Sequence, residues 1–317
     1  MAAHRYWRLS ITARSGDGYI QLNEINLSKI GETKHAASSV SASSIFSGPA
    51  SNCYDGNEST NLLLNNTALP ITVTFDLGSA KEVESVRILQ NNGTRYFTAA
   101  NVQWSDDNSN WTTAWSISSI NANYWNHRLD PNLNKKGLWR WNPTEAFGGT
   151  YTRISEIQLR ATSGGADLIH RATATEWYDV FGPWEAADND NSSDFIQALT
   201  GPGIIFEISS PQQIREIVIR SGNASTDQFP KSWQLHSSID GVTWVSEHSV
   251  TNDAGGWAVA TERTYTFLAD PSDVNGVSAG VATATGEISI YGQSSYVDEG
   301  LCRAIVQRNR RFAMVGM

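Results

Sequence analysis

A short acidic turn carries the clearest chemical signal in this chain of 317 residues. Asp55, Asn57 and Thr60 place several side-chain oxygen atoms close together in the sequence. Oxygen atoms are the ligands that a hard cation such as Ca²⁺ prefers, and about six to eight of them must converge on the ion. The same residue types also form Asx-turns, in which an Asp side chain accepts backbone N–H groups without any metal. Both interpretations stay open, and any such ion would be structural.

Aromatic residues in a predicted loop suggest a second kind of chemistry. Trp177, Tyr178 and Trp184 follow His170 and Arg171 in this loop. Aromatic rings can stack on the apolar faces of sugars, while charged and polar side chains bind the hydroxyl groups. Packing of the loop itself, or an interface with another chain, would explain the same residues. A second candidate set for sugar contact consists of Arg95, Tyr96 and Phe97, together with Trp125 and His127.

Patterns typical of catalysis are missing from the sequence. It contains no phosphate-binding loop, no His-x-x-x-His and no Cys-x-x-Cys. The paired carboxylates Asp106 and Asp107 fall in a predicted hairpin turn, where solvent surrounds them, and the six histidines are scattered. We therefore expect a protein that is not an enzyme.

These candidate residues lie within a duplicated unit. Trp7-Arg8 and Tyr19–Leu27 recur as Trp139-Arg140 and Tyr151–Leu159, at a constant offset of 132 residues (139 − 7 and 151 − 19). An interval of this length has the size of a whole domain, so it indicates two copies of one module. The counterparts of the acidic turn in the second copy are Asp188, Asp190 and Ser193.

Short segments of alternating polar and apolar residues, such as 70–78, are typical of half-buried strands. Turn signals recur every 8–12 residues or so, which favours a β-sandwich or barrel. We predict an all-β protein with one sandwich over residues 1–135 and a second over 136–270. Residues 271–317 form a C-terminal extension, which is either a solvated basic end or a segment that docks on a partner or another protomer. Six tryptophans on or beside predicted strands are expected in the cores: Trp7, Trp104, Trp111, Trp139, Trp233 and Trp244.

Charge and hydropathy exclude some classes of function. The formal net charge is −9 and the sequence pI is about 5.1, which argues against binding to nucleic acid or an anionic membrane. No apolar stretch is long enough for a membrane span, and no apolar segment typical of a signal peptide follows Met1. We expect no nucleic acid partner and no insertion into a membrane.

Several motifs resemble those of the discoidin, or coagulation factor 5/8 type C, domain. They are Phe75-Asp76-Leu77-Gly78, Val86-Arg87-Ile88 and the stretch from Ser238 to Trp244. The resemblance implies a β-sandwich of jelly-roll type whose loops at one end bind glycans, lipids or proteins. It also implies a structural Ca²⁺ at the acidic turn, held together with backbone carbonyls and a Glu from a closing strand. The implied ligands are Asp55, Asn57, Thr60 and Glu24 in the first copy, and Asp188, Asp190, Ser193 and Glu156 in the second.

The order of the motifs departs from the family. The block from Trp-Arg to Glu-Ile-x-Leu resembles the closing strands of the domain, yet here it opens each copy. Either the modules are circular permutants, or residues 138–159 close the first sandwich and the second borrows strands from elsewhere. The second copy also has Phe206-Glu207-Ile208-Ser209 in place of the Phe-Asp-Leu-Gly motif.

Modules that open with Tyr-Trp-Arg-Leu and carry Glu-Ile-x-Leu are similar to those in tail-associated and receptor-binding proteins of tailed bacteriophages. This resemblance implies a virion protein on the exterior of the particle, made in the host cytoplasm without a signal peptide. We expect it to bind host cell-surface glycans, other tail or capsid proteins and further copies of itself. The alternative is a structural virion protein, a capsid decoration or tail ornament, whose sandwiches only pack against neighbours.

Overall fold

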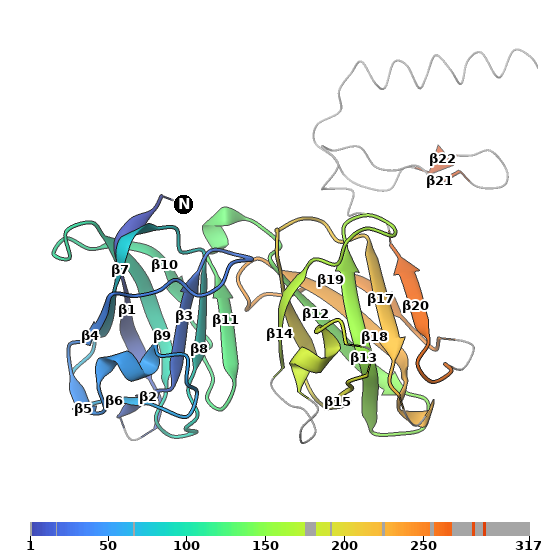
Figure 1. Cartoon of the computed structure of the whole chain (residues 1–317), viewed down its shortest axis with the longest axis horizontal. Helices are drawn as coiled ribbons and strands as arrows, with labels where there is room; N and C mark the ends of the chain where they lie inside the picture. The colour runs from blue at the N-terminus through green and yellow to red at the C-terminus, as the bar shows by residue number, and fades with distance from the viewer. Residues whose placement is uncertain are drawn as a thin grey trace, which may run out of the picture. The chain divides into compact units, whose positions relative to one another are not determined.

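The computed structural model shows an all-β protein (Figure 1). The compact part of the chain reaches to Thr266, and within it strands β1 to β11 form a first sandwich and strands β12 to β20 a second. The predicted fold class is confirmed. The structure describes residues 2–16, 18–65, 67–174, 182–190, 192–223, 226–253, 257–267, 281–282 and 288–289.

The first sandwich packs a five-stranded antiparallel sheet, in the order β10-β9-β1-β7-β4, against the three-stranded sheet β11-β8-β3. A small sheet, β2-β6-β5, and the 3-10 helix η1 complete it. The elements are β1 (His4–Arg14), β2 (Ile20–Leu22), β3 (Glu24–Ser28), β4 (Ser39–Ala42), β5 (Ile45–Ser47), η1 (Ala50–Cys53), β6 (Leu62–Leu64), β7 (Ile71–Lys81), β8 (Ser85–Leu89), β9 (Phe97–Ser105), β10 (Thr112–Ile117), β11 (Trp125–Leu129) and the following 3-10 helix η2 (Pro131–Leu133).

The second sandwich repeats the strand order of the five-stranded sheet. Its five-stranded sheet has the order β19-β18-β12-β16-β14, and its second sheet the order β20-β17-β13-β15. The elements are β12 (Leu138–Ala146), β13 (Tyr151–Arg160), β14 (Ile169–Ala174), η3 (Pro183–Ala186), β15 (Phe195–Ala198), β16 (Ile204–Ile208), β17 (Glu216–Ser221), η4 (Thr226–Gln228), β18 (Pro230–Ser238), β19 (Val245–Val250) and β20 (Glu262–Thr266). In the extension, β21 (Val281–Ala282) pairs with β22 (Ile288–Ser289).

Each opening block stays in its own sandwich. β1 lies between β7 and β9, and β12 takes the equivalent central place between β16 and β18. The hypothesis that residues 138–159 close the first sandwich is therefore wrong. The reason is the pairing register, in which Trp139 of β12 lies opposite Phe206 just as Trp7 of β1 lies opposite Phe75.

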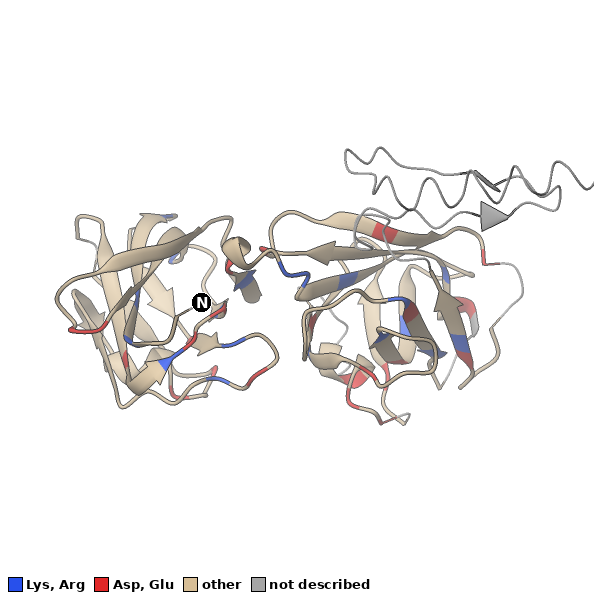
Figure 2. Ribbon diagram, turned by 90° about the horizontal axis from the view of Figure 1, so that it is seen from above, with Lys and Arg blue, Asp and Glu red and all other residues tan. Residues whose placement is uncertain are grey.

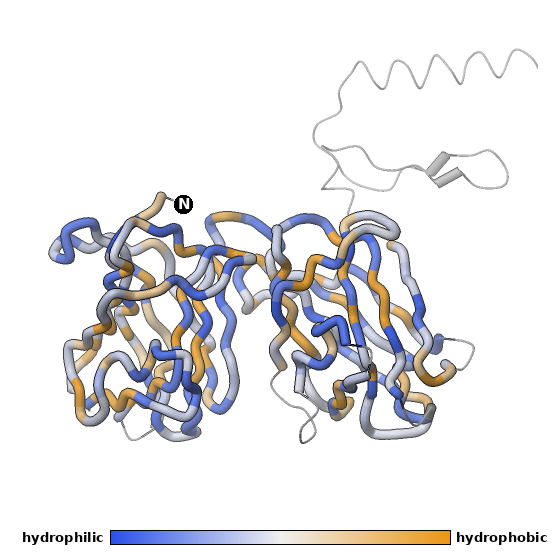
Figure 3. The backbone as a smooth tube through the Cα atoms, in the orientation of Figure 1, coloured by the Kyte–Doolittle hydropathy of each residue, from blue (hydrophilic) through white to orange (hydrophobic). Residues whose placement is uncertain are grey.

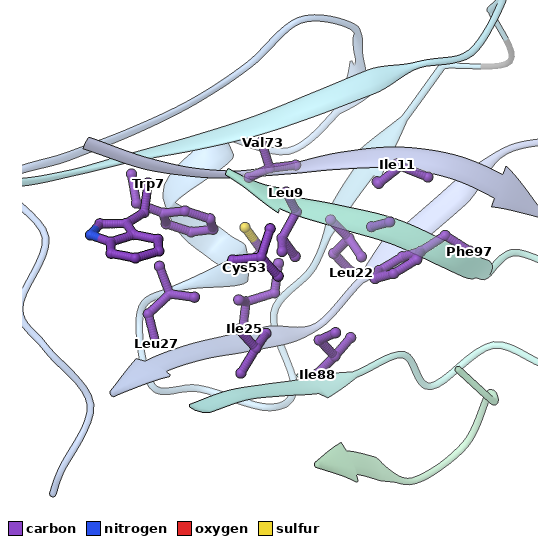
Figure 4. Packing of buried hydrophobic residues seen from close by; sticks show 14 of the residues in the cluster. Trp7, Leu9, Ile11, Leu22, Ile25, Leu27, Cys53, Val73, Ile88 and Phe97 are labelled. Carbon is purple, nitrogen blue, oxygen red and sulfur yellow. The ribbon is translucent and has the colours of Figure 1, made fainter. Parts of the chain in front are cut away.

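The repeated Trp-Arg pair follows from the geometry of a strand, in which successive side chains point to opposite faces. Trp7 points inward and is fully buried among the apolar residues of both sheets (Figure 4). Arg8 points outward, with its guanidinium carbon 4.1 Å from the ring centroid of Trp111. Arg140 lies over Trp244 in the same way, at 4.6 Å. The tryptophan of each pair thus fills the core, while the arginine that follows it contacts a tryptophan in the hairpin after β9 or β18.

The tryptophans predicted for the cores divide into two groups. Trp7, Trp139 and Trp233 are fully buried, as expected. Trp104, Trp111 and Trp244 are only half-buried. Trp104 lies opposite Trp7 and packs against the core, whereas Trp111 and Trp244 cover arginine side chains on the outer face. Along the strands, hydrophobic and hydrophilic positions alternate in both sandwiches (Figure 3), which is the pattern expected when one face of each sheet is buried.

A buried ionic cluster joins residues of the two sandwiches. Glu207 of β16 is fully buried and accepts the backbone N–H of Gly31 at 2.9 Å. Its Oε2 atom is 3.0 Å from Nε2 of His127 on β11 and 3.8 Å from Nε of Arg171 on β14. Buried charges of this kind are stable only when partners compensate them. The cluster therefore favours one arrangement of these strands over others.

Charged residues of both signs are interspersed along the sandwiches rather than collected on one face (Figure 2). No helix in the described part of the chain is long and apolar enough to cross a membrane.

Replacing Trp7 with alanine is expected to cost about 3–5 kcal/mol of unfolding free energy, because it leaves a large cavity between the sheets. Urea denaturation of the purified protein measures this. Thr12→Ala, at an exposed position of the same strand, is the matched control and should stay within about 0.5 kcal/mol of the parent. A loss below about 1 kcal/mol for Trp7→Ala would contradict the packing described.

Acid should weaken the ionic cluster through Glu207. Burial alone would raise the pKa of Glu207, but His127, Arg171 and the Gly31 N–H outweigh it and hold the pKa at about 2. A carboxyl group whose pKa is lowered in the folded state contributes stability above its unfolded pKa and loses it as the pH falls toward the folded value. The stability difference between the parent and Glu207→Gln should thus shrink as the pH falls from about 4.5 toward 2. Urea denaturation across this range tests it, and a constant difference throughout would refute it.

Candidate functional site

The acidic turn of the first sandwich forms Asx-turns. Asp55 Oδ1 accepts the backbone N–H of Asn57 at 2.8 Å, and Asn57 Oδ1 accepts that of Ser59 at 3.0 Å. The Thr60 hydroxyl donates to Asp55 Oδ2 at 2.9 Å. The residues predicted as cation ligands are thus brought together, but they also satisfy one another and the backbone.

Glu24, at the start of β3, lies beneath this turn and is only 2% exposed. Its Oε2 atom accepts the N–H of Gly56 at 3.0 Å, and its Oε1 atom accepts a hydrogen bond from Lys34 Nζ at 2.7 Å. The same ammonium donates to the carbonyl of Tyr54 at 3.0 Å and lies over the Tyr54 ring. Burial raises the pKa of Glu24, and the ammonium opposes that shift. With Lys34 in this place, the residues of the first turn do not fit a divalent cation.

The acidic turn of the second sandwich has the same internal hydrogen bonds. Asp188 Oδ1 accepts the N–H of Asp190 at 2.7 Å, and Asp190 Oδ1 accepts that of Ser192 at 2.9 Å. The Ser193 hydroxyl donates to Asp188 Oδ2 at 3.0 Å. The two turns are therefore equivalent in backbone and in side-chain bonding.

The buried glutamate beneath the second turn has a different environment. Glu156 is 4% exposed, and its Oε2 atom accepts the N–H of Asn189 at 3.1 Å. Its Oε1 atom is buried and has no hydrogen-bond partner among the described residues. Burial, followed by the negative charges of Asp167 and Asp188, raises the pKa of Glu156 to about 8.

One position explains the difference. The N–H of His35 donates to the carbonyl of Leu27 at 2.9 Å, and the N–H of Leu168 donates to that of Leu159 at the same distance. Since Leu27 and Leu159 are repeat partners, the residues just before these donors correspond: Lys34 in the first sandwich and Asp167 in the second. The charge beside the buried glutamate is thus reversed between the copies.

In the described stretches, no three or more His, Cys, Asp and Glu side chains converge as a metal-binding group. The donors available at the second turn are Glu156, Asp188, the Ser193 hydroxyl and backbone carbonyls. The unpartnered, buried Glu156 Oε1 is the observation that fits a cation there.

A separate surface of the first sandwich presents Tyr19, Phe46 and Arg95, which we call the aromatic–arginine cluster. Phe46, on β5, is 58% exposed, and its ring centroid is 5.1 Å from that of Tyr19 in an edge-on arrangement. The guanidinium carbon of Arg95 is 5.5 Å from the Tyr19 ring centroid. Two aromatic rings and a guanidinium group therefore lie close together on the surface.

The loops that carry this cluster are tied to each other. The carbonyl of Arg95 accepts the N–H of Gln21 at 2.7 Å. Gly16, with a φ of +76°, packs so closely on Thr94 that a Cβ atom would meet the Thr94 carbonyl oxygen. Asn92 Oδ1 accepts the N–H of Thr94 at 3.0 Å. The side chains of the cluster are thus presented from a fixed backbone.

Among the sugar-contact residues predicted in the first copy, Arg95 lies in the aromatic–arginine cluster, whereas Phe97 and His127 are buried. Phe97 is fully buried on β9, because it points to the core face of that strand. Tyr96 is half-buried beside it. Trp125 donates its indole N–H to Glu58 at 3.1 Å, and His127 lies in the buried ionic cluster. Neither Trp125 nor His127 adjoins the aromatic–arginine cluster through the contacts described.

Sequence reasoning missed Phe46 and the surface role of Tyr19. The signal was present, because Ile45-Phe46 stands between serines in a Ser-rich stretch without a strong strand pattern. Apolar residues in such surroundings lack partners for burial nearby in the sequence.

Of the sugar-contact residues predicted in the second copy, the structure describes Trp184, His170 and Arg171. Trp184, on η3, is 53% exposed and donates its indole N–H to Glu185 at 2.9 Å. Arg171 donates to the Glu32 carbonyl of the first sandwich at 2.8 Å and to Nε2 of its strand neighbour His170 at 3.0 Å. Its Nε atom lies 3.8 Å from the buried Glu207 carboxylate. Trp177 and Tyr178 lie outside the described residues.

In the comparison with known proteins, one family model matches part of the chain. The F5/8 type C domain matches residues 35–157. Domains of this family commonly bind carbohydrates or mediate protein interactions, and they are typically not catalytic. No curated protein and no solved structure matches the chain.

The matched stretch crosses from one sandwich into the other. It begins before β4 and ends within β13, so its last strands, β12 and β13, belong to the second sandwich. By the repeat, these strands correspond to β1, β2 and β3, which fill the same places in the first sandwich. The match thus begins in the first sandwich and ends with strands of the second whose repeat counterparts open the first.

Proposed function

We propose that this chain is a non-enzymatic carbohydrate-binding protein and that the aromatic–arginine cluster of the first sandwich is its sugar site. The observation that carries the proposal is the 58% exposed ring of Phe46 beside Tyr19 and Arg95. A large exposed aromatic residue loses hydrophobic stabilisation unless a ligand or partner covers it.

The chemistry of the cluster suits a sugar. The ring faces of Phe46 and Tyr19 can pack on the C–H faces of a pyranose, and the Arg95 guanidinium can donate to hydroxyl or carboxylate oxygens. Because the loops are held by Gly16, Asn92 and the Gln21–Arg95 backbone bond, little conformational entropy is lost on binding.

A second contact on the same chain would strengthen weak binding. Trp184 of the second sandwich, which is 53% exposed, is an aromatic residue that could provide it. Two weak sites on one chain, and further copies in an oligomer, raise the overall affinity through effective concentration.

We further propose a place on a phage particle. The support is the resemblance of the opening block at Tyr6–Leu9 and of the Glu-Ile-x-Leu stretches at 24–27 and 156–159 to those of tail-associated proteins. In this setting the protein would bind host cell-surface glycans while other tail or capsid proteins and copies of itself hold it on the virion exterior. The alternative, a structural ornament, would bury Phe46 in a contact with a neighbouring virion protein.

A glycan array with the purified chain tests the sugar site. Phe46→Ala should weaken binding to any glycan that the parent protein binds on the array. We expect a loss of about tenfold or more, because a stacked ring is removed. Val245→Ala removes a similarly exposed apolar side chain from β19 and should leave binding unchanged. Retained glycan binding in Phe46→Ala would exclude the cluster as the site. A folded parent without any glycan ligand would favour the structural role.

We also propose that the second acidic turn binds a structural Ca²⁺ through Glu156, Asp188 and the Ser193 hydroxyl. The unpartnered Glu156 Oε1 supports it.

Saturating Ca²⁺ should raise the melting temperature of the parent, since a ligand that binds only the folded state stabilises it, by about 2.7 kcal/mol at 100 times the Kd. EDTA should reverse the effect, and Glu156→Gln should abolish it. Thermal melts followed by circular dichroism provide the measurement. Melting curves that coincide with Ca²⁺ and with EDTA would refute the proposal.

A further inference from the structure

We infer that the Lys34 side chain is a built-in replacement for a metal ion in the first sandwich, so that the duplicated chain has one metal-independent and one metal-dependent copy. The assignment of Lys34 stands on the first sandwich alone. Its contrast with the second copy rests on the cation proposed there.

The first step is the charge that must be compensated. Glu24 is 2% exposed, and a carboxylate removed from water at this depth is stable only with a cation or several donors beside it. One oxygen atom has the Gly56 N–H, and the other has the Lys34 ammonium at 2.7 Å. The required positive charge is therefore part of the chain.

The second step is the position of that charge. Lys34 Nζ binds a carboxylate oxygen of Glu24 and the Tyr54 carbonyl oxygen, and these are the two kinds of ligand that a calcium ion takes. It also lies 3.9 Å from where a Cβ atom of Gly56 would stand, so it sits against the turn itself. A divalent cation between Glu24 and the turn would be strongly repelled by an ammonium at this distance.

The third step is the equivalent position in the second copy. Asp167 stands where Lys34 does, so a negative charge replaces the positive one next to Glu156. The Glu156 oxygen atom that corresponds to the lysine-bound one has no partner. The first copy therefore has a cationic side chain, Lys34, beside its buried glutamate, and the second copy has none at the equivalent position.

The consequence concerns the dependence of each copy on its surroundings. The turn of the first sandwich should keep its structure at any Ca²⁺ concentration, including in a chelator. The turn of the second sandwich should gain stability when the ion is bound.

Metal stoichiometry tests the contrast on the full chain. Native mass spectrometry with Ca²⁺ should show one ion per chain, which Glu156→Gln removes and Glu24→Gln leaves in place. A second ion in the parent that Glu24→Gln removes would overturn the inference about Lys34. The absence of any bound ion would refute only the cation proposed in the second copy, because the next experiment decides the role of Lys34 independently.

Stability in EDTA tests Lys34 directly. Lys34→Met should lower the melting temperature by about 6–12 °C, because it leaves a buried carboxylate without its counter-charge. The double variant Lys34→Met/Glu24→Gln should recover most of this loss, since no uncompensated charge remains. Lys29→Met, whose exposed ammonium pairs with Glu82, is the control and should shift the melting temperature by no more than about 2 °C.

The response of Lys34 variants to Ca²⁺ shows whether the Lys34 ammonium takes the place of a cation or only contributes packing. Ca²⁺ should raise the melting temperature of Lys34→Met/Glu156→Gln, in which only the first turn can respond, and should not raise that of Glu156→Gln alone. If Lys34→Met is as stable as the parent, or if Glu24→Gln does not rescue it, the inference fails. If Lys34→Met does not fold, recovery of a folded protein by adding Glu24→Gln carries the same information.

Discussion

A buried glutamate beneath an acidic turn is the constraint on which much of each sandwich depends. Glu24 and Glu156 lie at equivalent strand positions and are almost completely buried. Each accepts a backbone N–H group of the turn above it. A carboxylate in that environment must be neutralised, either by a proton, by a charge of the chain or by an ion. The position occupied by Lys34 in one copy and Asp167 in the other decides which of these applies.

The duplicated framework around these turns depends on one central strand. β1 and β12 each lie in the middle of a five-stranded sheet, and each directs a tryptophan to the core and the next residue, an arginine, to the outer face. The arginine covers the tryptophan of a hairpin far along the chain, so a local pair of residues connects two distant segments. Such a strand can stand at the front or at the back of the sequence, because only its pairing matters. This accounts for the family match that crosses the boundary between the sandwiches.

Some residues of the types expected in a binding site instead stabilise the fold. Arg171 and His127 have the residue types expected of a binding site, but both compensate the buried carboxylate of Glu207. Phe46 remains exposed beside Tyr19 and Arg95. An exposed aromatic side chain of this size is available to a ligand.

The sequence by itself determined the all-β class, the duplication and the general strand order. These follow from local alternation and from the constant offset between Trp7 and Trp139, which need no knowledge of distant contacts. It also identified both acidic turns, because the hydrogen bonds of an Asx-turn join residues two positions apart. It brought Arg95 into view, but it could not separate this residue from its neighbour Phe97, whose side chain points to the core.

Tertiary structure alone decided which charges meet. Lys34 and Glu24 are ten residues apart, and His127 and Glu207 are eighty apart, so no local pattern signals either pair. The pairing of β1 within its own sandwich, the exposure of Phe46 and the missing partner of Glu156 likewise depend on how separate strands pack. The reason is that burial and charge compensation are properties of three-dimensional proximity, whereas periodicity and turn chemistry are properties of neighbours in the chain.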